Sequence, residues 1–519
     1  MDFDSTHLHE TLPRLLKAYW PPVLVGLLLL HFLANKFRSG LVSIPGPSLA
    51  AYTNFWRFRD TWRGTAHKSY RELHDHYGPL VRIGPNIVSV SDPEAIPIIY
   101  NIKTDFHKAR ATSDGTASAE VQKFIYKKKR VANLFSHIDP AVHRSKKRLF
   151  GNAYSLSSIL EAEPGLISVT TLFMKSLRER SSKPIDLGEW LEYYTYDSIG
   201  EIALARRLGF LRNGGDIDGM IPLGAILSNY ASVVSQKPIL DWFGLANPLF
   251  PYLLPSIETK NGVLNLTIKT MEELGFSGPP ENLKSCTGGD FLSHMARARA
   301  ADPERYSSDD ILIQTSATVF AATDTTAITL RAIIYYLLRN PLVLSRFTAE
   351  LDAAEPLLSP VITYRESIDT LPYLQAVVKE AMRLHPAIGL PLERYVPAGG
   401  ATIAGKFLPA GTTVGMSAWV VHRNPDIFTE PDAFVPERWI GSPPDQLKRM
   451  EKSMFQFGAG ARSCVGKYVA QIQTSTLIPQ LFREFDVQLE DKDKEWEVTA
   501  RWFVQQVGLV VNLVPRRST

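Results

Sequence analysis

The sequence has few cysteines and little net charge, and both shortages exclude classes of protein. Its 519 residues include only two cysteines, Cys286 and Cys464. A secreted scaffold held by disulfides would contain more, so we expect a reducing compartment. The formal net charge is only +4. A dedicated nucleic-acid binder carries a concentrated basic surface, so nucleic acid is not expected as a partner.

One long uncharged segment, residues 18–35, lies near the N-terminus. Its 18 residues are near the shortest length that spans a bilayer as a helix. Residues 1–17 precede it as a leader, and residues 36–50 follow it as a basic and Pro/Gly-containing hinge. A cleaved signal peptide is the alternative, but charges rather than a small-residue cleavage pattern follow Leu33. We therefore expect a single transmembrane anchor ahead of a catalytic body at residues 51–519.

The hydrophobic pattern predicts a body that is mainly α with small β-sheets. Repeats and low-complexity tracts are absent, which favours one domain. The pattern predicts a helix at residues 65–77, a hairpin at 80–90 and mainly helix over 140–386. Residues 309–339 contain neither proline nor glycine and are apolar on most sides, which predicts one long core helix. Short strands, turns and irregular segments are expected from there to Gly460, followed by another helix.

Residues 101–136 show no clear period, and we expect a long loop with short helices. This segment contains the basic run KKKR at residues 127–130. A charge run is usually a solvated face. A surface for a redox partner or for a membrane is the alternative interpretation.

The sequence FGAGARSCVG, residues 457–466, carries the strongest chemical signal. Its glycines allow tight turns and a close approach to a flat partner. Cys464 precedes a predicted helix, where N–H groups and the helix dipole stabilise a thiolate. Arg462 adds a positive charge suited to a carboxylate. A structural cysteine is the alternative, but the combination favours a metal-bearing, anionic, planar cofactor.

Two other patterns each have a plain structural explanation as well as a functional one. Glu380 and Arg383 share one face of a predicted helix, where an isolated surface pair is worth under about 1 kcal/mol. Asp324, in AATDTT, interrupts the long apolar helix, and its burial without partners would be costly. A core polar group satisfied by its neighbours is the alternative for Asp324.

The pattern F-x-x-G-x-R-x-C-x-G, filled by Phe457, Gly460, Arg462, Cys464 and Gly466, resembles that of the cytochrome P-450 family. The resemblance covers nearly the whole chain, and the local sequence is similar to that of fungal microsomal members close to the pisatin-demethylase-like group. It implies that the cofactor is haem b (iron protoporphyrin IX). In that family the cysteine thiolate is the axial ligand of the haem iron. By the same resemblance, Phe457 shields the thiolate and Arg462 binds a haem propionate.

The resemblance also gives roles to the other two patterns. It implies that Glu380, Arg383 and Arg438, the last in PERW, form a buried structural trio. It implies that Asp324 and Thr325 deliver protons during oxygen activation, as general acid catalysis requires.

Small departures from the family accompany these patterns. Trp439 stands where phenylalanine is more usual, and Ala322 stands where glycine is more usual. Three more cations, His143, Lys147 and Arg394, match positions that contact propionates in the family. A basic, solvated helix face is the alternative for His143 and Lys147.

The implied activity is monooxygenation, in which one atom of O2 enters an apolar small molecule and the other leaves as water. Flavin and nicotinamide motifs are absent, so electrons are expected from NADPH through NADPH–cytochrome P-450 reductase. The expected setting is fungal secondary metabolism at the endoplasmic reticulum membrane, with a single pass and a catalytic domain facing the cytosol. The substrate pocket is expected along residues 106–135, at Phe320 and Ala321, and at residues 388–390.

Two other functions remain open from the sequence. One is a haem-thiolate isomerase or dehydratase that inserts no oxygen. The other is a non-catalytic, membrane-anchored haem-binding protein. A secreted protein would expose the sequon at Asn265 to glycosylation, whereas the cytosolic orientation predicts that Asn265 stays bare.

Overall fold

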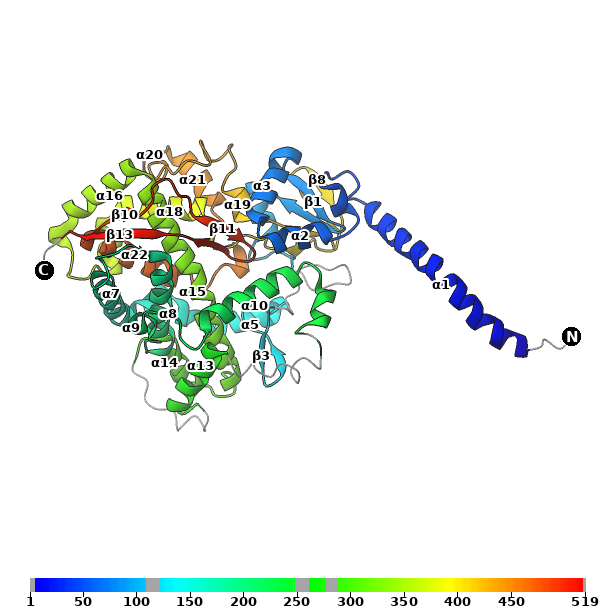
Figure 1. Ribbon diagram of the computed structural model, residues 1–519, viewed down its shortest axis with the longest axis horizontal. Helices are drawn as coiled ribbons and strands as arrows, with labels where there is room; N and C mark the ends of the chain where they lie inside the picture. Colours follow the sequence, from blue (N-terminus) through cyan, green and yellow to red (C-terminus); the bar gives the residue numbers. More distant parts are fainter. Residues whose placement is uncertain (1–4, 109–121, 246, 248–260, 277–287, 517–519) are drawn as a thin grey trace.

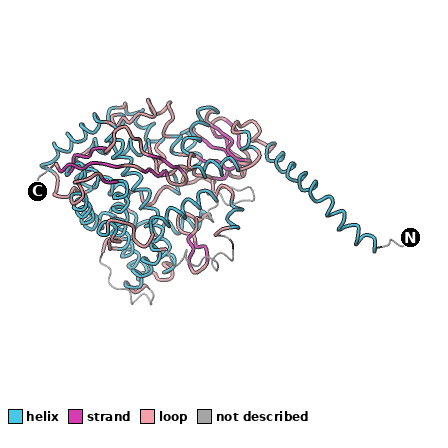
Figure 2. Tube along the Cα trace, in the orientation of Figure 1, coloured by secondary structure: helices cyan, strands magenta, loops and turns pink. Residues whose placement is uncertain are grey.

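The structure is a computed structural model that describes residues 5–108, 122–245, 247, 261–276 and 288–516, with the side chains of the first helix from Tyr19 onward. Helices make up most of the body, and the strands lie in small sheets (Figure 1; Figure 2). The predicted fold class, mainly α with small β-sheets, is confirmed.

The centre of the body is α15 (Ser308–Arg339), which confirms the helix predicted at residues 309–339. The Ser307 hydroxyl caps it by accepting the backbone N–H of Asp310, and the helix ends before Asn340. Most of its side chains are buried. The helices that pack most extensively against it are α8 (Leu187–Leu204), α13 (Gly262–Glu273), α18 (Pro372–Leu384) and α22 (Lys467–Glu484).

The other helices surround this core. They are α2 (Phe55–Arg63), α3 (Ala66–Tyr77), α4 (Ile96–Ile99), α5 (Pro140–Phe150), α6 (Leu156–Glu161), α7 (Glu163–Arg178), α9 (Phe210–Asn213), α10 (Met220–Val234), α14 (Phe291–Ala301), α16 (Pro341–Ala354), α17 (Tyr364–Thr370), α19 (Ala418–Val421), α20 (Arg438–Gly441) and α21 (Pro444–Ser453). Short 3₁₀ turns connect them: η1 (Ser48–Ala51), η2 (Pro93–Ala95), η3 (Gly151–Tyr154), η4 (Pro238–Phe243), η6 (Glu355–Leu357) and η7 (Gly460–Arg462).

Two larger sheets and three hairpins complete the body. The first sheet has the order β1 (Leu80–Gly84), β2 (Ile87–Val90), β9 (Thr413–Gly415), β6 (Arg394–Tyr395). The second has the order β10 (Phe485–Leu489), β13 (Val510–Pro515), β5 (Ile185–Asp186). The hairpins are β3 (Phe124–Tyr126) with β4 (Lys129–Val131), β7 (Ala401–Ile403) with β8 (Lys406–Leu408), and β11 (Glu497–Ala500) with β12 (Val504–Val507). The predicted helix at residues 65–77 and hairpin at 80–90 are confirmed by α3 and by β1–β2.

The first helix, α1 (Ser5–Lys36), projects away from the body (Figure 1). Its large apolar side chains from Val23 to Leu33 are exposed. The buried guanidinium of Arg82 on β1 donates to the carbonyl oxygens of Asn35 and Lys36. This cation satisfies carbonyl groups at the C-terminal end of α1 and ties the base of the helix to the first sheet.

The expectation of short helices in residues 101–136 is wrong for the described part of that segment. A hairpin, β3–β4, stands there instead, and residues 109–121 lie outside the described residues. Lys127 and Lys128 form its turn with φ of +49° and +58°. The turn lacks the glycine or asparagine that usually marks a two-residue hairpin, so the hairpin was not predictable from the residue types at its turn.

One helix in the described part of the chain is long and apolar enough to cross a membrane, and it is α15. Since 72% of its most apolar stretch is buried, α15 is better explained as the core helix. The sequon at Asn265 lies within α13. Its third residue, Thr267, is fully buried and donates to the carbonyl oxygen of Val263. In the folded protein the sequon is therefore closed at Thr267, although Asn265 itself is exposed.

Candidate active site

The cysteine loop runs from Phe457 through η7 into α22. Its N-terminal part is closed by the backbone N–H of Cys464, which donates to the carbonyl oxygen of Phe457 at 2.9 Å. Gly460 has a φ of +66°. A Cβ at Gly460 would lie 1.7 Å from the carbonyl oxygen of Tyr100, so this contact requires glycine. Phe457 is half-buried and packs against the main core.

The side chain of Cys464 is accessible, yet protein atoms surround it densely enough for burial to raise its thiol pKa. A thiol on the outer surface would not be desolvated in this way. The combination indicates that the sulfur faces an internal hollow. The backbone of Gly466 and the charges of Lys147 and Lys467 favour the thiolate, but burial outweighs them. A bound metal cation would supply the missing stabilisation.

The middle of α15 borders a hollow as well. Ala321 is exposed although it lies at the centre of a buried helix, and Ala317 and Thr325, four residues to either side, are half-buried. These three positions share one face of the helix. The hydroxyl of Thr325 donates to the carbonyl oxygen of Ala321 at 2.8 Å. The predicted pocket residue Ala321 therefore faces open space inside the body.

Asp324 lies beside this face and is only 8% exposed. Burial, and to a lesser extent the charge of Glu192, raises the pKa of Asp324 to about 7 against the opposing charge of Arg331. The structure thus places Thr325 toward the hollow and Asp324 toward α8. A carboxyl group with a pKa near 7 can hold and release a proton at neutral pH.

Tyr154 connects the cysteine side of the molecule with α15. Its hydroxyl pairs with the hydroxyl of Thr318 and accepts a hydrogen bond from Gln314 at 2.8 Å. The pKa of Tyr154 is raised to about 12, mainly by burial and also by the nearby Cys464. Tyr154 therefore contacts α15 and lies close enough to Cys464 for the charge of the thiolate to affect its pKa.

The cysteine loop is tied to α5 and to the residues before it. Arg462 donates to the carbonyl oxygens of His137 and Ile138 at 2.7 and 2.9 Å. Lys147 donates to the carbonyl oxygen of Ala461 at 2.7 Å. His143 is buried, and its pKa is lowered to about 3 by burial and by the nearby Arg462 and Lys147. At neutral pH His143 is therefore an uncharged donor or acceptor, not a cation.

Lys108 is a cation of this site that the sequence did not single out. Its ammonium donates to the carbonyl oxygen of Phe135 at 2.8 Å and to the amide oxygen of Gln122 at 3.2 Å. Burial lowers the pKa of Lys108 well below its usual value, and Arg462 and Arg394 lower it further. Residues 108 and 394 also form an antiparallel bridge. Since Lys108 belongs to no motif, only the fold shows its position.

Lys108, Arg394 and Arg462 form a cluster of cations. Burial lowers the pKa of all three, and neighbouring positive charges lower it further for Lys108 and Arg462. Among the described residues, the carboxylate whose charge affects this cluster is that of Glu393, which raises the pKa of Arg394. Desolvated cations in such proximity are stabilised by an anionic partner. An accessible cysteine, a hollow beside α15 and this cationic cluster fit an iron porphyrin with two carboxylates.

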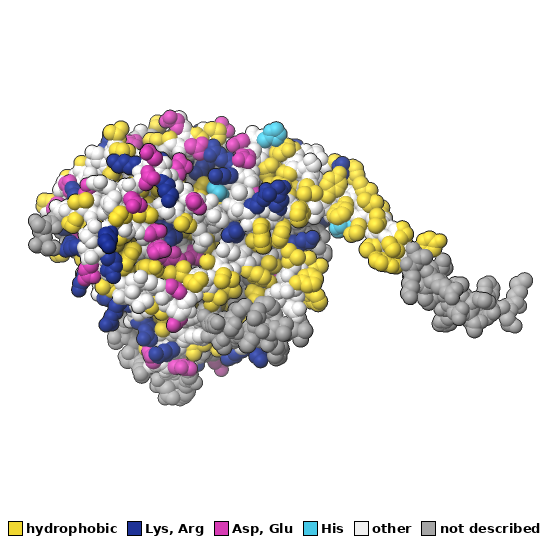
Figure 3. Space-filling model, viewed as in Figure 1, with side chains coloured by type: hydrophobic (Ala, Val, Ile, Leu, Met, Phe, Trp, Pro, Cys, Tyr) yellow, Lys and Arg dark blue, Asp and Glu magenta, His cyan; other side chains and the backbone are white. Residues whose placement is uncertain are grey.

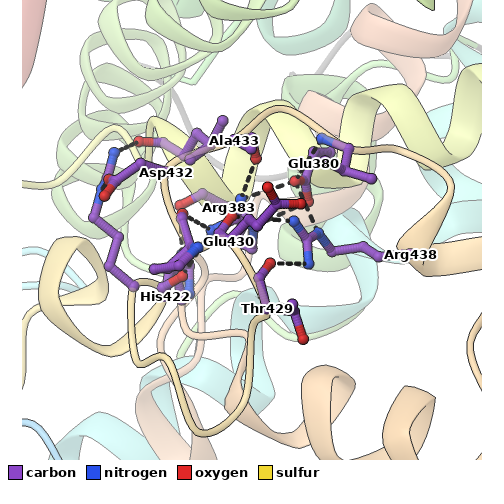
Figure 4. Close-up of polar contacts among 12 residues, drawn as sticks. Glu380, Arg383, His422, Thr429, Glu430, Asp432, Ala433 and Arg438 are labelled. Atoms are coloured by element: carbon purple, nitrogen blue, oxygen red, sulfur yellow. Dashed lines mark hydrogen bonds and ion pairs between the residues drawn. The ribbon is translucent and has the colours of Figure 1, made fainter.

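The trio of Glu380, Arg383 and Arg438 meets in the interior (Figure 4). The Glu380 carboxylate accepts two hydrogen bonds from Arg383, at 2.8 and 2.9 Å, and one from Arg438 at 3.0 Å. The indole N–H of Trp439 donates to it at 2.8 Å, and the backbone N–H of Val435 at 3.0 Å. Trp439 therefore adds a hydrogen bond that phenylalanine could not supply.

Aromatic side chains lie near the predicted pocket segments. Phe320 on α15 contacts Phe124 of β3 with ring centroids 6.4 Å apart. Phe135 contacts Trp502, which follows β11, with centroids 5.6 Å apart. The sequence did not point to Trp502, because its place beside residues 106–135 depends on the packing of the C-terminal hairpin.

Comparisons with known proteins identify relatives of this chain. A family model described as "Cytochrome P-450" matches residues 44–512. The chain is 36% identical to the cytochrome P-450 monooxygenase cicH of Emericella nidulans, over 93% of this chain and 95% of that protein. It is 37% identical to a cytochrome P-450 monooxygenase of Aspergillus terreus, over 90% and 95% of the two chains. It is 31% identical to pisatin demethylase of Fusarium vanettenii, over 93% and 92%.

Proposed function

The chain belongs to the cytochrome P-450 family, and from that premise we propose that it is a haem-thiolate monooxygenase acting on an apolar small molecule in fungal secondary metabolism. The observation that carries the proposal is the accessible but desolvated Cys464, in the same loop as Arg462 of a partly buried cluster of cations. A structural cysteine would have no need of either feature.

Haem b supplies the redox chemistry of oxygen activation when it is bound. Cys464 would hold its iron, and Gly466 leaves room beside the sulfur, since a Cβ there would lie 4.0 Å away. Lys108, Arg394 and Arg462 would bind the two propionates. Neutral His143 would add a hydrogen bond, and Lys147 holds the loop through Ala461.

Asp324 and Thr325 would carry the proton into the hollow. Asp324 has a carboxyl group that is about half protonated near neutral pH. The Thr325 hydroxyl donates to the carbonyl oxygen of Ala321, so its oxygen is left to accept a hydrogen bond from water. Haem-thiolate isomerases and dehydratases, which insert no oxygen, have less need of such an acid, and this favours monooxygenation.

Membrane attachment is the second part of the proposal, with the endoplasmic reticulum as the site and the body facing the cytosol. It is supported by the exposed apolar side chains of α1. Hydrophobic side chains also gather on the face of the body near the base of α1 (Figure 3). They include Phe55 and Trp62 on α2, and Trp242 and Phe243 on η4, with α10 packed against both elements. Such a surface next to an apolar helix fits the interface of a bilayer.

Electrons would come from NADPH through NADPH–cytochrome P-450 reductase. The test is reconstitution of the chain with this reductase in phospholipid vesicles, with isotopically labelled O2 and a panel of apolar aromatic compounds. We expect a product that gains one labelled oxygen atom and that requires both NADPH and the reductase. Products formed without labelled oxygen would instead favour an isomerase or dehydratase.

A further inference from the structure

His422 is a buried histidine that none of the sequence motifs included. It follows α19 and is fully buried. Its Nε2 lies 2.7 Å from the backbone nitrogen of Phe455, and its Nδ1 lies 3.0 Å from the carbonyl oxygen of Arg383. A backbone N–H can only donate, so Nε2 accepts and Nδ1 carries the proton. His422 is thus a neutral imidazole with one fixed tautomer.

The two partners of His422 belong to different parts of the site. Arg383 is held by Glu380, and its guanidinium also donates to the carbonyl oxygen of His422 at 2.9 Å (Figure 4). His422 and Arg383 are therefore joined by two hydrogen bonds. Arg383 and Arg423 are the charged groups that act on the imidazole, and both keep it neutral in addition to burial.

Phe455, the other partner, lies two residues before the cysteine loop. It is buried, its ring packs against Tyr100 at 4.8 Å, and its carbonyl oxygen accepts the N–H of Gly458 at 2.9 Å. Tyr100 in turn contacts Gly460 through its carbonyl oxygen. The N–H of Phe455 is thus the point at which the interior network reaches the loop of Cys464.

We propose that His422 is a positioning residue, which transmits the location of the Glu380–Arg383 ion pair to the loop of Cys464. The inference rests on the proposed haem-thiolate function. Loss of the imidazole acceptor would leave the buried N–H of Phe455 unpaired. The loop would then shift to find another partner, and a ligand must be held within about 0.5 Å of its productive position.

Two variants separate the two ends of this link. His422→Asn places an amide N–H where Nδ1 stood, so it keeps the bond to Arg383 but cannot reach Phe455. His422→Gln places its carbonyl oxygen near the position of Nε2, so it can accept from Phe455. His385→Asn is the matched control: His385 is buried, its pKa is also lowered to about 3 by burial, and its Nε2 donates to the carbonyl oxygen of Val504 at 3.1 Å.

The readout is the absorption spectrum of the reduced, carbon-monoxide-bound protein. Each haem-loaded variant is held at the same interval below its own unfolding midpoint, and the loss of the strongly red-shifted Soret band is followed in time. We expect His422→Asn to lose this band roughly tenfold faster than the wild type, as the loss of a buried hydrogen bond implies. For His422→Gln and His385→Asn we expect a rate of loss within about twofold of the wild-type rate, because both variants keep an acceptor for the N–H of Phe455.

Equal rates for His422→Asn and His385→Asn would overturn the inference, because the effect would then be one of general stability. If His422→Asn does not fold, His422→Gln decides: a wild-type rate supports the inference, and a rate well above that of His385→Asn contradicts it. A wild type without the red-shifted band contradicts the proposed haem-thiolate function instead.

Discussion

Asp324 combines burial with a raised pKa in a way that predicts a pH-dependent stability. Its pKa is about 7 in the folded protein against an ordinary value of 3.8. The folded state therefore binds more protons than the unfolded state between these values, and stability falls as pH rises from about 4 to 7. The variant Asp324→Asn has no carboxyl group at this position, so its stability should not fall with pH for this reason.

We expect Asp324→Asn to unfold at higher urea concentration than the wild type at pH 8, by a free energy on the order of 2–4 kcal/mol. The difference should shrink at pH 5, where both side chains are uncharged. Urea unfolding at the two pH values checks this. A difference that is the same at pH 5 and pH 8 would show that the carboxyl group is not the cause.

Lys108 gives a second prediction at the scale of single residues. Its ammonium is desolvated beside Arg394 and Arg462, so removal of its charge should weaken the retention of an anionic cofactor. We expect Lys108→Met to release haem to an excess of haem-accepting apoprotein roughly tenfold faster than the wild type, the factor that about 1.4 kcal/mol implies. Lys103→Met, at an exposed lysine of the same segment, is the control. Equal release rates in the two variants would remove Lys108 from the site.

Local patterns in the sequence reveal some of these residues and hide others. The glycine-rich motif placed Cys464 and Arg462 in one loop because both lie within ten residues. Lys108, His422 and Trp502 could not be identified in this way, because each has a partner that is distant in the chain: Phe135, Phe455 and Phe135 respectively. Lysine, histidine and tryptophan are common enough that type alone does not mark a site.

At the scale of elements, α15 was predictable in extent but not in the environment of its faces. The absence of proline and glycine predicted its length, while its nearly uniform apolar pattern could not show which face borders the hollow. The β3–β4 hairpin was missed for a different reason, since its turn consists of two lysines. The trio around Glu380 was predictable in part. Its members come from two separate helices, α18 and α20, but each belongs to a short sequence motif.

The hollow beside α15 can be tested by adding volume to the helix. Ala321 is exposed to the hollow, whereas Ala327, on the same helix, is fully buried. We expect Ala321→Leu to change the free energy of unfolding by less than about 0.5 kcal/mol, and Ala327→Leu to lower it by about 1–3 kcal/mol through overpacking. Urea unfolding of both variants checks this. Similar losses in both would contradict an open space at Ala321.

At the scale of the whole molecule, the base of α1 is joined to the body through Arg82, which binds the carbonyl oxygens of Asn35 and Lys36. The helix and the apolar face of α2, α10 and η4 together define one side of the protein. The sequence predicted the apolar segment of α1, but the gathering of α2 and η4 on one side depends on the fold. This arrangement predicts that the body retains a weak affinity for bilayers without α1.

Deletion of residues 1–33 keeps the contacts of Arg82 and removes the apolar part of α1. We expect full-length protein to stay with phospholipid vesicles after alkaline carbonate extraction and the deletion variant to be released by it. At neutral pH and low salt the deletion variant should still co-float in part with vesicles. If carbonate also extracts the full-length protein, α1 is not an integral membrane anchor.

The central claim is that Cys464 ligates a haem iron, and the absorption spectrum of the reduced, carbon-monoxide-bound protein tests it most directly. The measurement compares the wild type with Cys464→Ser. We predict a strongly red-shifted Soret band in the wild type and its loss in the variant, because a thiolate ligand gives the band its position. A wild-type band typical of imidazole-ligated haem, or a red-shifted band that survives in Cys464→Ser, would contradict the assignment.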